Sequence, residues 1–577
     1  MADYARLLKV ARGDEPADLV IRNGTLLNVL TREEHPATVG ICEDTIAYVT
    51  DPQDTRCEGR QIVDASGMWL APGLIDSHMH IESTHATPEH LANAILPRGV
   101  TTIAQDPHEM ANVLGVEGVD YMRRAARNLP LRVLTFVPTC VPAVPGLETS
   151  GAEFGAREVE ALLDDPHTIG LAEVMDYWGV IRQSPRITQI VQVGRRRGVI
   201  LTGHIRGVGG RDLNAYLAAG IDSDHELLNA EGIWTRSRLG MTVELPCQVH
   251  ADAIPAAVEA WRQRGYLGDV VFVTDDVPPH ELQREGHLDR AVRRAIALGM
   301  APVDALRAST LVPARRLRRP DLGAIAPGRR ADLLVIADLA AFALHMTIAS
   351  GKIIAQDGKM TQPAERQCQP PKGALASVHL SARTREDFTL RSSVPQVQAR
   401  IIAQRGRALE VHAAAVVGGS VAWHQHPEWA LAAVLHRHGR NSNCGMALLG
   451  GSGLQRGAIA TTYAHDSHNL VVLGRDEADM AAAANALIDC GGGYVAACDG
   501  QVQALVALPV AGLLAEQPVE RLAEGFERFE QAAGRLGVAH NPIRLLTSLP
   551  LPVVPSYRLT DCGLVDVEQQ ALLPAFE

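Results

Sequence analysis

The chain has few aromatic residues, no apolar run long enough to cross a bilayer, and no closely spaced pair of cysteines. Phenylalanine, tyrosine and tryptophan make up 4% of its 577 residues, and its formal net charge is -12. Nucleic-acid binding needs concentrated basic charge and usually stacking rings, so this composition argues against a nucleic-acid partner. The lack of long apolar runs argues against a membrane partner. We therefore expect a small-molecule substrate.

The cysteines also bear on where the protein works. There are nine, an odd number, and they are scattered along the chain. This pattern suits reduced thiols better than a disulfide framework, and the amino terminus shows no apolar core followed by a cleavage site. We expect a cytoplasmic protein. Its length predicts two to four structural units.

Short β-branched runs separated by turn signals occur at both ends of a central region. Those in residues 1–70 predict a small antiparallel sheet, and similar runs return in residues 321–365. We expect these two segments to complete one small β-sandwich domain around an inserted unit. The polar, proline-rich stretch 362–371 predicts a linker. Beyond it, residues 366–577 predict a C-terminal α+β domain with a helix from Glu477 to Ile488.

The central region, residues 71–320, alternates apolar β-rich runs with stretches of helical period. Strands that are apolar on both faces and separated by helices indicate a parallel sheet covered by helices. So many repeats favour an α/β fold of the closed (β/α)₈ TIM-like barrel type over an open sheet. The expected strands are 100–103, 132–137, 170–172, 199–202 and 270–273, and a helix is expected at 288–297.

Imidazole and carboxylate side chains follow the ends of these strands, where such a barrel places its active site. His78 and His80 are two residues apart, and residues at this spacing share one face of an extended segment. The residues that follow later strands are His108, Glu173, His204, His225, Asp275 and Asp276. Taken singly, each of them also fits an ordinary role, as a buried histidine, a helix cap or a turn. Together with His78 and His80 they predict a site for two metal ions.

The sequence resembles the amidohydrolase superfamily and, within it, the adenine deaminase family. The superfamily resemblance rests on residues 71–80 and 323–335. The narrower resemblance rests on short matching stretches along nearly the whole chain. These are 80–83, 96–102, 106–109, 273–276, 285–289, 456–460 and 464–469.

The resemblance assigns roles to the residues at the strand ends. His78 and His80 would bind one metal ion, His204 and His225 the second, and Glu173 would bridge the two. Asp275, preferred to Asp276 because it comes first after its strand, would contact the first metal and act as an acid/base group. His108 would be the second acid/base residue. Asp275, His108 and Glu173 are thus the expected catalytic residues.

The resemblance also implies the chemistry. Two divalent ions, manganese or iron by family resemblance with zinc also suited to these ligands, would generate a bridging hydroxide. Its attack on C6 of adenine would release ammonia and leave hypoxanthine, a reaction of purine metabolism. A homo-oligomer, dimer or higher, is a further implication of the resemblance.

The sequence departs from the family near the expected substrate pocket. Thr84-His85, residues 205–210 and residues 243–247 replace other residues of the family pattern. Glu82, His85 and Arg206 are candidate substrate-binding residues, although His85 and Arg206 also fit exposed positions. The departures keep open an amidohydrolase that cleaves another C–N bond, in a cyclic amide or lactam, an N-acyl amide or another aminopurine. A metal-stabilised scaffold would have no need for both Asp275 and His108.

Overall fold

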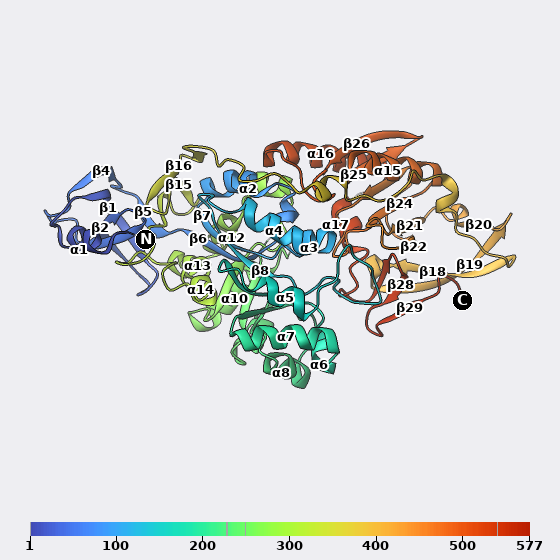
Figure 1. Ribbon diagram of the computed structural model, residues 1–577, viewed down its shortest axis with the longest axis horizontal. Coiled ribbons are helices and arrows are strands. Elements are labelled where there is room, and N and C mark those ends of the chain that lie inside the picture. The colour runs from blue at the N-terminus through green and yellow to red at the C-terminus, as the bar shows by residue number, and fades with distance from the viewer. Residues whose placement is uncertain (1, 227–228, 248–249, 539) are drawn as a thin grey trace.

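The computed structural model describes residues 2–226, 229–247, 250–538 and 540–577. Three regions follow one another along its long axis, with the N-terminal strands at one end and the C-terminal region at the other (Figure 1). The parallel strands that carry the expected site residues lie between them. None of the described helices is both long and apolar enough to cross a membrane.

The two flanking segments build one nine-stranded sheet. The junction is the antiparallel pairing of β5 with β14, so the chain leaves this sheet after β5 and rejoins it at β14. The expected antiparallel arrangement is only partly right, because β4 and β5 pair in parallel with β1. The segments are α1 (Tyr4–Arg12), β1 (Ala17–Asn28), β2 (Glu33–Cys42), β3 (Thr45–Thr50), β4 (Gly59–Asp64), β5 (Trp69–Pro72), β14 (Leu333–Asp338), β15 (Ala343–Ala349), β16 (Lys352–Gln356) and β17 (Lys359–Met360).

Eight strands of the central region form two parallel sheets. The five-stranded sheet contains β6 (Leu74–Met79), β7 (Val100–Gln105), β8 (Arg132–Val137), β9 (Thr168–Val174) and β10 (Ile200–Gly203). The three-stranded sheet contains β11 (Ser223–Asp224), β12 (Thr242–Pro246) and β13 (Val270–Val273). The parallel, helix-covered strands expected from the apolar runs are therefore present, in two sheets.

The two parallel sheets meet at the carboxyl ends of β6 and β13. Asp275 N–H donates to the His78 carbonyl oxygen (3.1 Å), and His80 N–H donates to the Asp275 carbonyl oxygen (3.3 Å). Met79 and Asp275 form an isolated parallel bridge between these bonds. This junction lies where the expected metal ligands leave their strands.

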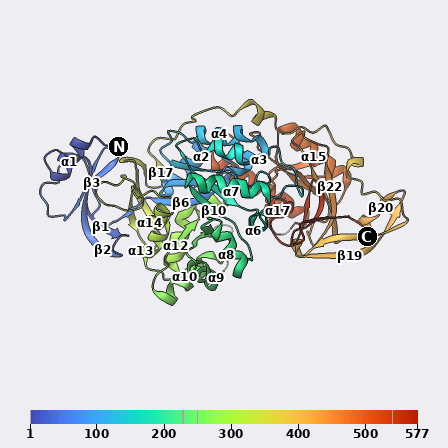
Figure 2. The same cartoon turned by 60° about the horizontal axis from the view of Figure 1, so that its bottom comes forward.

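Helices cover the outside of the parallel strands, as α7, α8 and α10 show in two views (Figures 1 and 2). The helix expected at 288–297 is confirmed as α12 (Leu288–Ala297). The others are α2 (Pro88–Ile95), α3 (His108–Leu114), α4 (Val116–Ala125), α5 (Ala156–Leu162), α6 (Tyr177–Arg182), α7 (Pro185–Arg197), α8 (Gly210–Ala218), α9 (Ala230–Ser237), α10 (Ala253–Arg264), α11 (Pro279–Glu285), α13 (Pro302–Ser309) and α14 (Leu311–Arg316).

The C-terminal region contains a second nine-stranded sheet, built from β18 to β26. Its central strand β24 (Leu470–Gly474) is buried on both faces: Val472 packs with α15 (Glu477–Cys490), whereas Val471 belongs to the larger core that includes α16 (Val519–Arg535). Alternate side chains of a strand point to opposite faces, so this strand is apolar throughout. The remaining elements are β18 (Gln396–Ala403), β19 (Ala408–Val417), β20 (Ser420–Val421), β21 (Trp429–Leu435), β22 (Cys444–Gly450), β23 (Ala458–Thr461), β25 (Gly493–Cys498), β26 (Gln501–Ala507), α17 (Pro542–Ser548) and a sheet of β27 (Tyr557–Thr560), β28 (Gly563–Asp566) and β29 (Ala571–Leu573).

The C-terminal region packs against the carboxyl ends of the parallel strands. His85 donates through Nδ1 to the Leu513 carbonyl oxygen (2.9 Å), and Ala515 N–H donates to the His85 carbonyl oxygen (2.9 Å). The His85 ring also stacks on Phe526 of α16, with ring centroids 4.9 Å apart. The two regions therefore share one packed boundary next to the expected site.

Candidate active site

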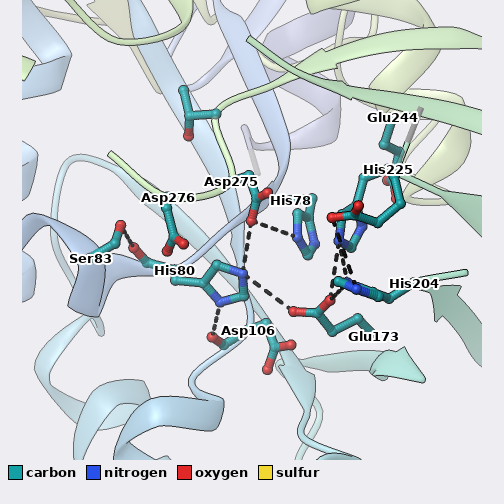
Figure 3. A network of polar contacts seen from close by, with 12 residues as sticks. His78, His80, Ser83, Asp106, Glu173, His204, His225, Glu244, Asp275 and Asp276 are labelled. Carbon is teal, nitrogen blue, oxygen red and sulfur yellow. Dashed lines mark hydrogen bonds and ion pairs between the residues drawn. The ribbon is translucent and has the colours of Figure 1, made fainter. Parts of the chain in front are cut away.

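Glu173, at the end of β9, is the centre of the site (Figure 3). Its Oε2 lies 2.8 Å from His204 Nδ1 and 3.1 Å from His225 Nε2, while its Oε1 lies 3.5 Å from His80 Nε2. One carboxylate thus faces two groups of imidazoles, one through each oxygen. This is the position that a bridging ligand requires.

His78 and His80 lie on the other side of Glu173, together with Asp275 (Figure 3). Asp275 Oδ1 is 3.4 Å from His78 Nε2 and 3.2 Å from His80 Nε2. His80 Nδ1 donates to the Asp106 carbonyl oxygen (3.1 Å), which turns its Nε2 toward the two carboxylates. A backbone acceptor that fixes the tautomer in this way is a usual feature of metal-binding histidines.

His108, the first residue of α3, is also part of this cluster. Its Nδ1 bonds the Asp106 carboxylate (3.0 Å) and lies 3.6 Å from Glu173 Oε1. Its Nε2 lies 3.4 Å from Glu109 Oε2. The structure therefore brings His108 together with all six expected metal ligands.

The candidate substrate residues have less uniform positions. Glu82 is fully buried and accepts from the Met110 N–H (3.2 Å); burial, followed by the charge of Glu109, raises its pKa to about 8. The His85 ring lines the cavity but is held among aromatic rings of the C-terminal region. Arg206 is partly exposed at the cavity, with its Nε 3.4 Å from Glu226 Oε2.

Residues 243–247, which we interpreted as a substituted pocket stretch, form strand β12 up to Pro246. The Glu244 side chain lies inside the protein, with Oε1 3.4 Å from the Ser77 hydroxyl and 3.8 Å from Arg316 Nε. This stretch is therefore part of a parallel sheet. Cys247 directly follows the strand and is buried.

The site charges are set by burial and by close neighbours. Burial alone would raise the pKa of Asp275 and of Glu173, but hydrogen bonds and charges from the surrounding histidines hold both pKa values well below the usual range. Burial alone would lower the pKa of His108, but the neighbouring acidic groups raise it well above its usual value. Asp275 is therefore ionised near neutral pH, whereas His108 carries a proton.

The donor set fits metal ions. Buried nitrogen atoms of His78 (Nε2), His204 (Nε2) and His225 (Nδ1) have no hydrogen-bond partner within the described ranges. Several groups of imidazole and carboxylate atoms meet here, each with its ligand atoms within 4.8 Å of one another. They include His78 with His225 and Asp275; Glu173 with His204 and His225; and His80 with Asp106, His108 and Glu173. Imidazole with carboxylate ligation suits Zn, Mn or Fe.

A cavity of about 730 Å³ opens beside this cluster. Its size is typical of small-molecule sites. The central region lines it with His80, Glu173 and Asp275, and the C-terminal region adds Tyr463 and His465. A ligand in this cavity would therefore touch both regions.

Several polar residues at the site were not assigned a role from the sequence. Asp106 and Glu109 lie inside the matching stretch 106–109, so their proximity to His108 was a usable signal. Tyr463, His465 and Asp466 come from the C-terminal region. The matching stretch 464–469 pointed to two of them, but nothing local placed them beside the parallel strands.

Parallel strands that carry imidazoles and carboxylates at their carboxyl ends, beside a cavity of this size, define a metal-dependent hydrolase. Residues 69–354 match the amidohydrolase family, and residues 407–571 match the adenine deaminase C-terminal domain. Adenine deaminase 2 of Agrobacterium fabrum is 43% identical over 538 residues, covering 92% of this chain and 89% of the relative. Adenine deaminase of Klebsiella pneumoniae is 41% identical over 570 residues, covering 97% and 94%. The chain belongs to the adenine deaminase family.

A solved structure is similar over part of the chain. The beta-aspartyl dipeptidase of Fervidobacterium islandicum matches with a TM-score of 0.46 and 20% identity, covering 60% of this chain and 98% of that one.

Proposed function

We propose that this protein hydrolyses adenine to hypoxanthine and ammonia. The observation that carries this proposal is the convergence of Glu173, Asp275 and the histidines on one cavity, in a chain about 40% identical to adenine deaminases along nearly its whole length. Its C-terminal region also matches the adenine deaminase C-terminal domain. The reaction consumes one water: a C–O bond forms at C6, and the C6–N bond breaks.

Two divalent ions fit the donor set. His78, His80 and Asp275 would hold one ion, His204 and His225 the other, and Glu173 would bridge them. Manganese or iron is proposed, with zinc also suited to these ligands. When bound, the ions supply Lewis acidity that favours ionisation of a water at neutral pH.

The residues divide the proton transfers between them. Asp275, held ionised, accepts a proton from the attacking water. His108, held protonated, donates to the departing amine as the C6–N bond breaks. Glu82, His85 and Arg206 are proposed to contact the substrate, Glu82 and His85 from the segment after β6 and Arg206 from the cavity rim.

We also propose a domain arrangement. The two parallel sheets would form one (β/α)₈ barrel over residues 71–320. Residues 1–70 and 321–365 would form a small β-sandwich domain, and the residues from 366 onward a C-terminal domain. A homo-oligomer that works in purine metabolism in the cytoplasm is part of the proposal.

The test is to load the purified chain with Mn²⁺ or Fe²⁺, measure bound metal, and follow ammonia release from adenine. Other aminopurines, lactams and N-acyl amides form the panel. Adenine turnover with two ions per chain supports the proposal. Cleavage of a lactam or acyl amide without adenine turnover would replace the adenine proposal with hydrolysis of that other C–N bond. Two bound ions without any turnover would point to a metal-stabilised scaffold.

A further inference from the structure

The C-terminal region contributes polar side chains to the wall of the catalytic cavity. Tyr463, His465 and Asp466 lie between β23 and β24 and line the cavity together with Tyr494 of β25. Tyr463 and His465 face Glu109 of the central region, and His465 also faces Asp276. Glu109 and Tyr463, which are 354 positions apart in the sequence, therefore share one cavity wall.

The segment that carries His465 is anchored on both sides. His465 N–H donates to the Thr547 carbonyl oxygen (3.1 Å), and His468 N–H donates to the Ala464 carbonyl oxygen (2.8 Å). The buried guanidinium of Arg437 donates through Nε to the His468 carbonyl oxygen (2.5 Å). These bonds fix the His465 backbone at the cavity, so its ring has a defined position.

The His465 ring lies among three carboxylates without a close hydrogen bond to any of them. Its Nε2 is 3.4 Å from Asp276 Oδ2, and its Nδ1 is 3.5 Å from Glu109 Oε1 and 3.6 Å from Asp466 Oδ1. An N–H···O hydrogen bond usually measures 2.7–3.2 Å. The ring nitrogens therefore retain hydrogen-bonding capacity toward a ligand in the cavity.

The surrounding carboxylates also have acceptor atoms to spare. Glu109 is fully buried: its Oε1 accepts from the Tyr463 hydroxyl (3.1 Å), whereas its Oε2 makes no hydrogen bond in the described part of the chain and has only longer ion-pair contacts, to His108 Nε2 (3.4 Å) and His80 Nδ1 (3.6 Å). Asp276 Oδ1 also makes no hydrogen bond in that part of the chain. Leaving a buried acceptor unpaired is unfavourable, so a ligand that donates N–H groups would be stabilised here.

We propose that His465 contacts the substrate, binding the edge of the purine ring and helping to select the base. An adenine ring offers ring-nitrogen acceptors and amine donors around its edge. An imidazole has two nitrogens that pair with such an edge, and Glu109 and Asp276 accept the base N–H groups. This inference rests on the proposed function and adds to it a specificity residue from the C-terminal region.

A third metal ion is the competing role, because His108, Glu109 and His465 also form a group of possible ligands. The two roles differ in what the loss of His465 does. A substrate contact changes base affinity and leaves the metal content unchanged. A metal ligand changes the metal content.

The experiment uses the full-length chain loaded with Mn²⁺. We compare His465→Phe, which keeps a flat ring without nitrogen, with His465→Gln, whose amide reaches the position of Nε2. The matched control is His412→Gln, at an exposed histidine of β19. Bound metal, KM and kcat for adenine, and the Kd of hypoxanthine by calorimetry are measured for each.

For His465→Phe we expect KM and the hypoxanthine Kd to rise about ten-fold or more, as loss of a ligand hydrogen bond does, with two ions still bound. His465→Gln should recover part of this loss, and His412→Gln should match the wild type. Unchanged KM and Kd in His465→Phe, with the wild type active on adenine, would overturn this inference but leave the proposed function standing. Loss of metal in that variant would also overturn it. If the wild type neither deaminates adenine nor binds hypoxanthine, the proposed function fails and this inference with it.

Discussion

The hydroxyl of Thr274 donates a 2.6 Å hydrogen bond to a carboxyl oxygen of Asp76. Both side chains are fully buried, and Asp76 also accepts from the backbone N–H of His78 (3.3 Å). Thr274 precedes Asp275, and Asp76 precedes His78 by two residues. One carboxyl group thus links the ends of β6 and β13 beside the candidate metal site.

Replacing Thr274 with valine tests this link. Thr274→Val keeps the shape of the side chain but leaves Asp76 without its hydroxyl partner, so we expect a loss of about 1–3 kcal/mol in the free energy of unfolding. Urea unfolding of the metal-free chain measures it. Thr55→Val, at an exposed threonine, is the control and should leave the unfolding midpoint in place. Equal midpoints for both variants would show that the Asp76 bond is dispensable.

Asp275→Asn should abolish turnover while the fold stays intact. Asparagine occupies the same volume but cannot accept the water proton, and loss of a general base typically costs 10²–10⁴-fold in rate, so we expect kcat for adenine to fall by about that factor. Steady-state ammonia release, with circular dichroism as the check on folding, measures the effect. A near-normal rate would remove Asp275 from the mechanism.

Glu173→Gln should reduce metal binding before anything else. The amide carries no charge and has one oxygen where the carboxylate has two. It would therefore be a poorer ligand for ions held between His80 on one side and His204 and His225 on the other. We expect fewer than two ions per chain after loading and dialysis, measured by elemental analysis. Glu477→Gln, at the start of α15, is the matched control and should keep two. Full occupancy in Glu173→Gln would argue against a bridging role.

The stability of the protein should depend on the protonation of Glu148. Burial, together with the smaller effect of the Asp466 charge, raises the pKa of this carboxyl from 4.5 to about 8. Between these values the folded state binds more protons than the unfolded chain, so the free energy of unfolding falls as pH rises from 4.5 to 8.

Glu148→Gln removes this dependence. Relative to the wild type, the variant should gain on the order of a few kcal/mol between pH 5 and pH 8, because each pKa unit is worth about 1.4 kcal/mol. Urea unfolding at several pH values gives the slope, with Glu160→Gln at an exposed position as the control. Parallel pH slopes for Glu148→Gln and the wild type would contradict the assignment.

The apolar runs predicted several of the parallel strands because buried strands between helices are apolar on both faces. The run at 270–273 coincides with β13. β12 was missed because Glu244 interrupts its apolar pattern; one oxygen of this carboxylate accepts from Ser77 and lies 3.8 Å from Arg316 Nε, both distant in sequence. β11 has only two residues, too few for any periodic signal.

The site residues also divide into those that a local sequence pattern predicts and those that it does not. Glu173, His204 and Asp275 could be predicted because each follows a recognisable strand, and parallel strands end at the same edge. His465 and Tyr463 depend on how the C-terminal region packs against that edge, through contacts such as those of His85 with Leu513 and Phe526. Such packing has no local pattern in the sequence.

The candidate metal ligands come from both parallel sheets, since Glu173 lies near the end of β9 in one and His225 follows β11 of the other. Ions bound between them would hold the two sheets together and favour the folded state. A shortage of the bound metal would then shorten the lifetime of the polypeptide against proteases, in addition to lowering its activity. Abundance of the protein in the cell would follow nutrient metal supply even at constant synthesis.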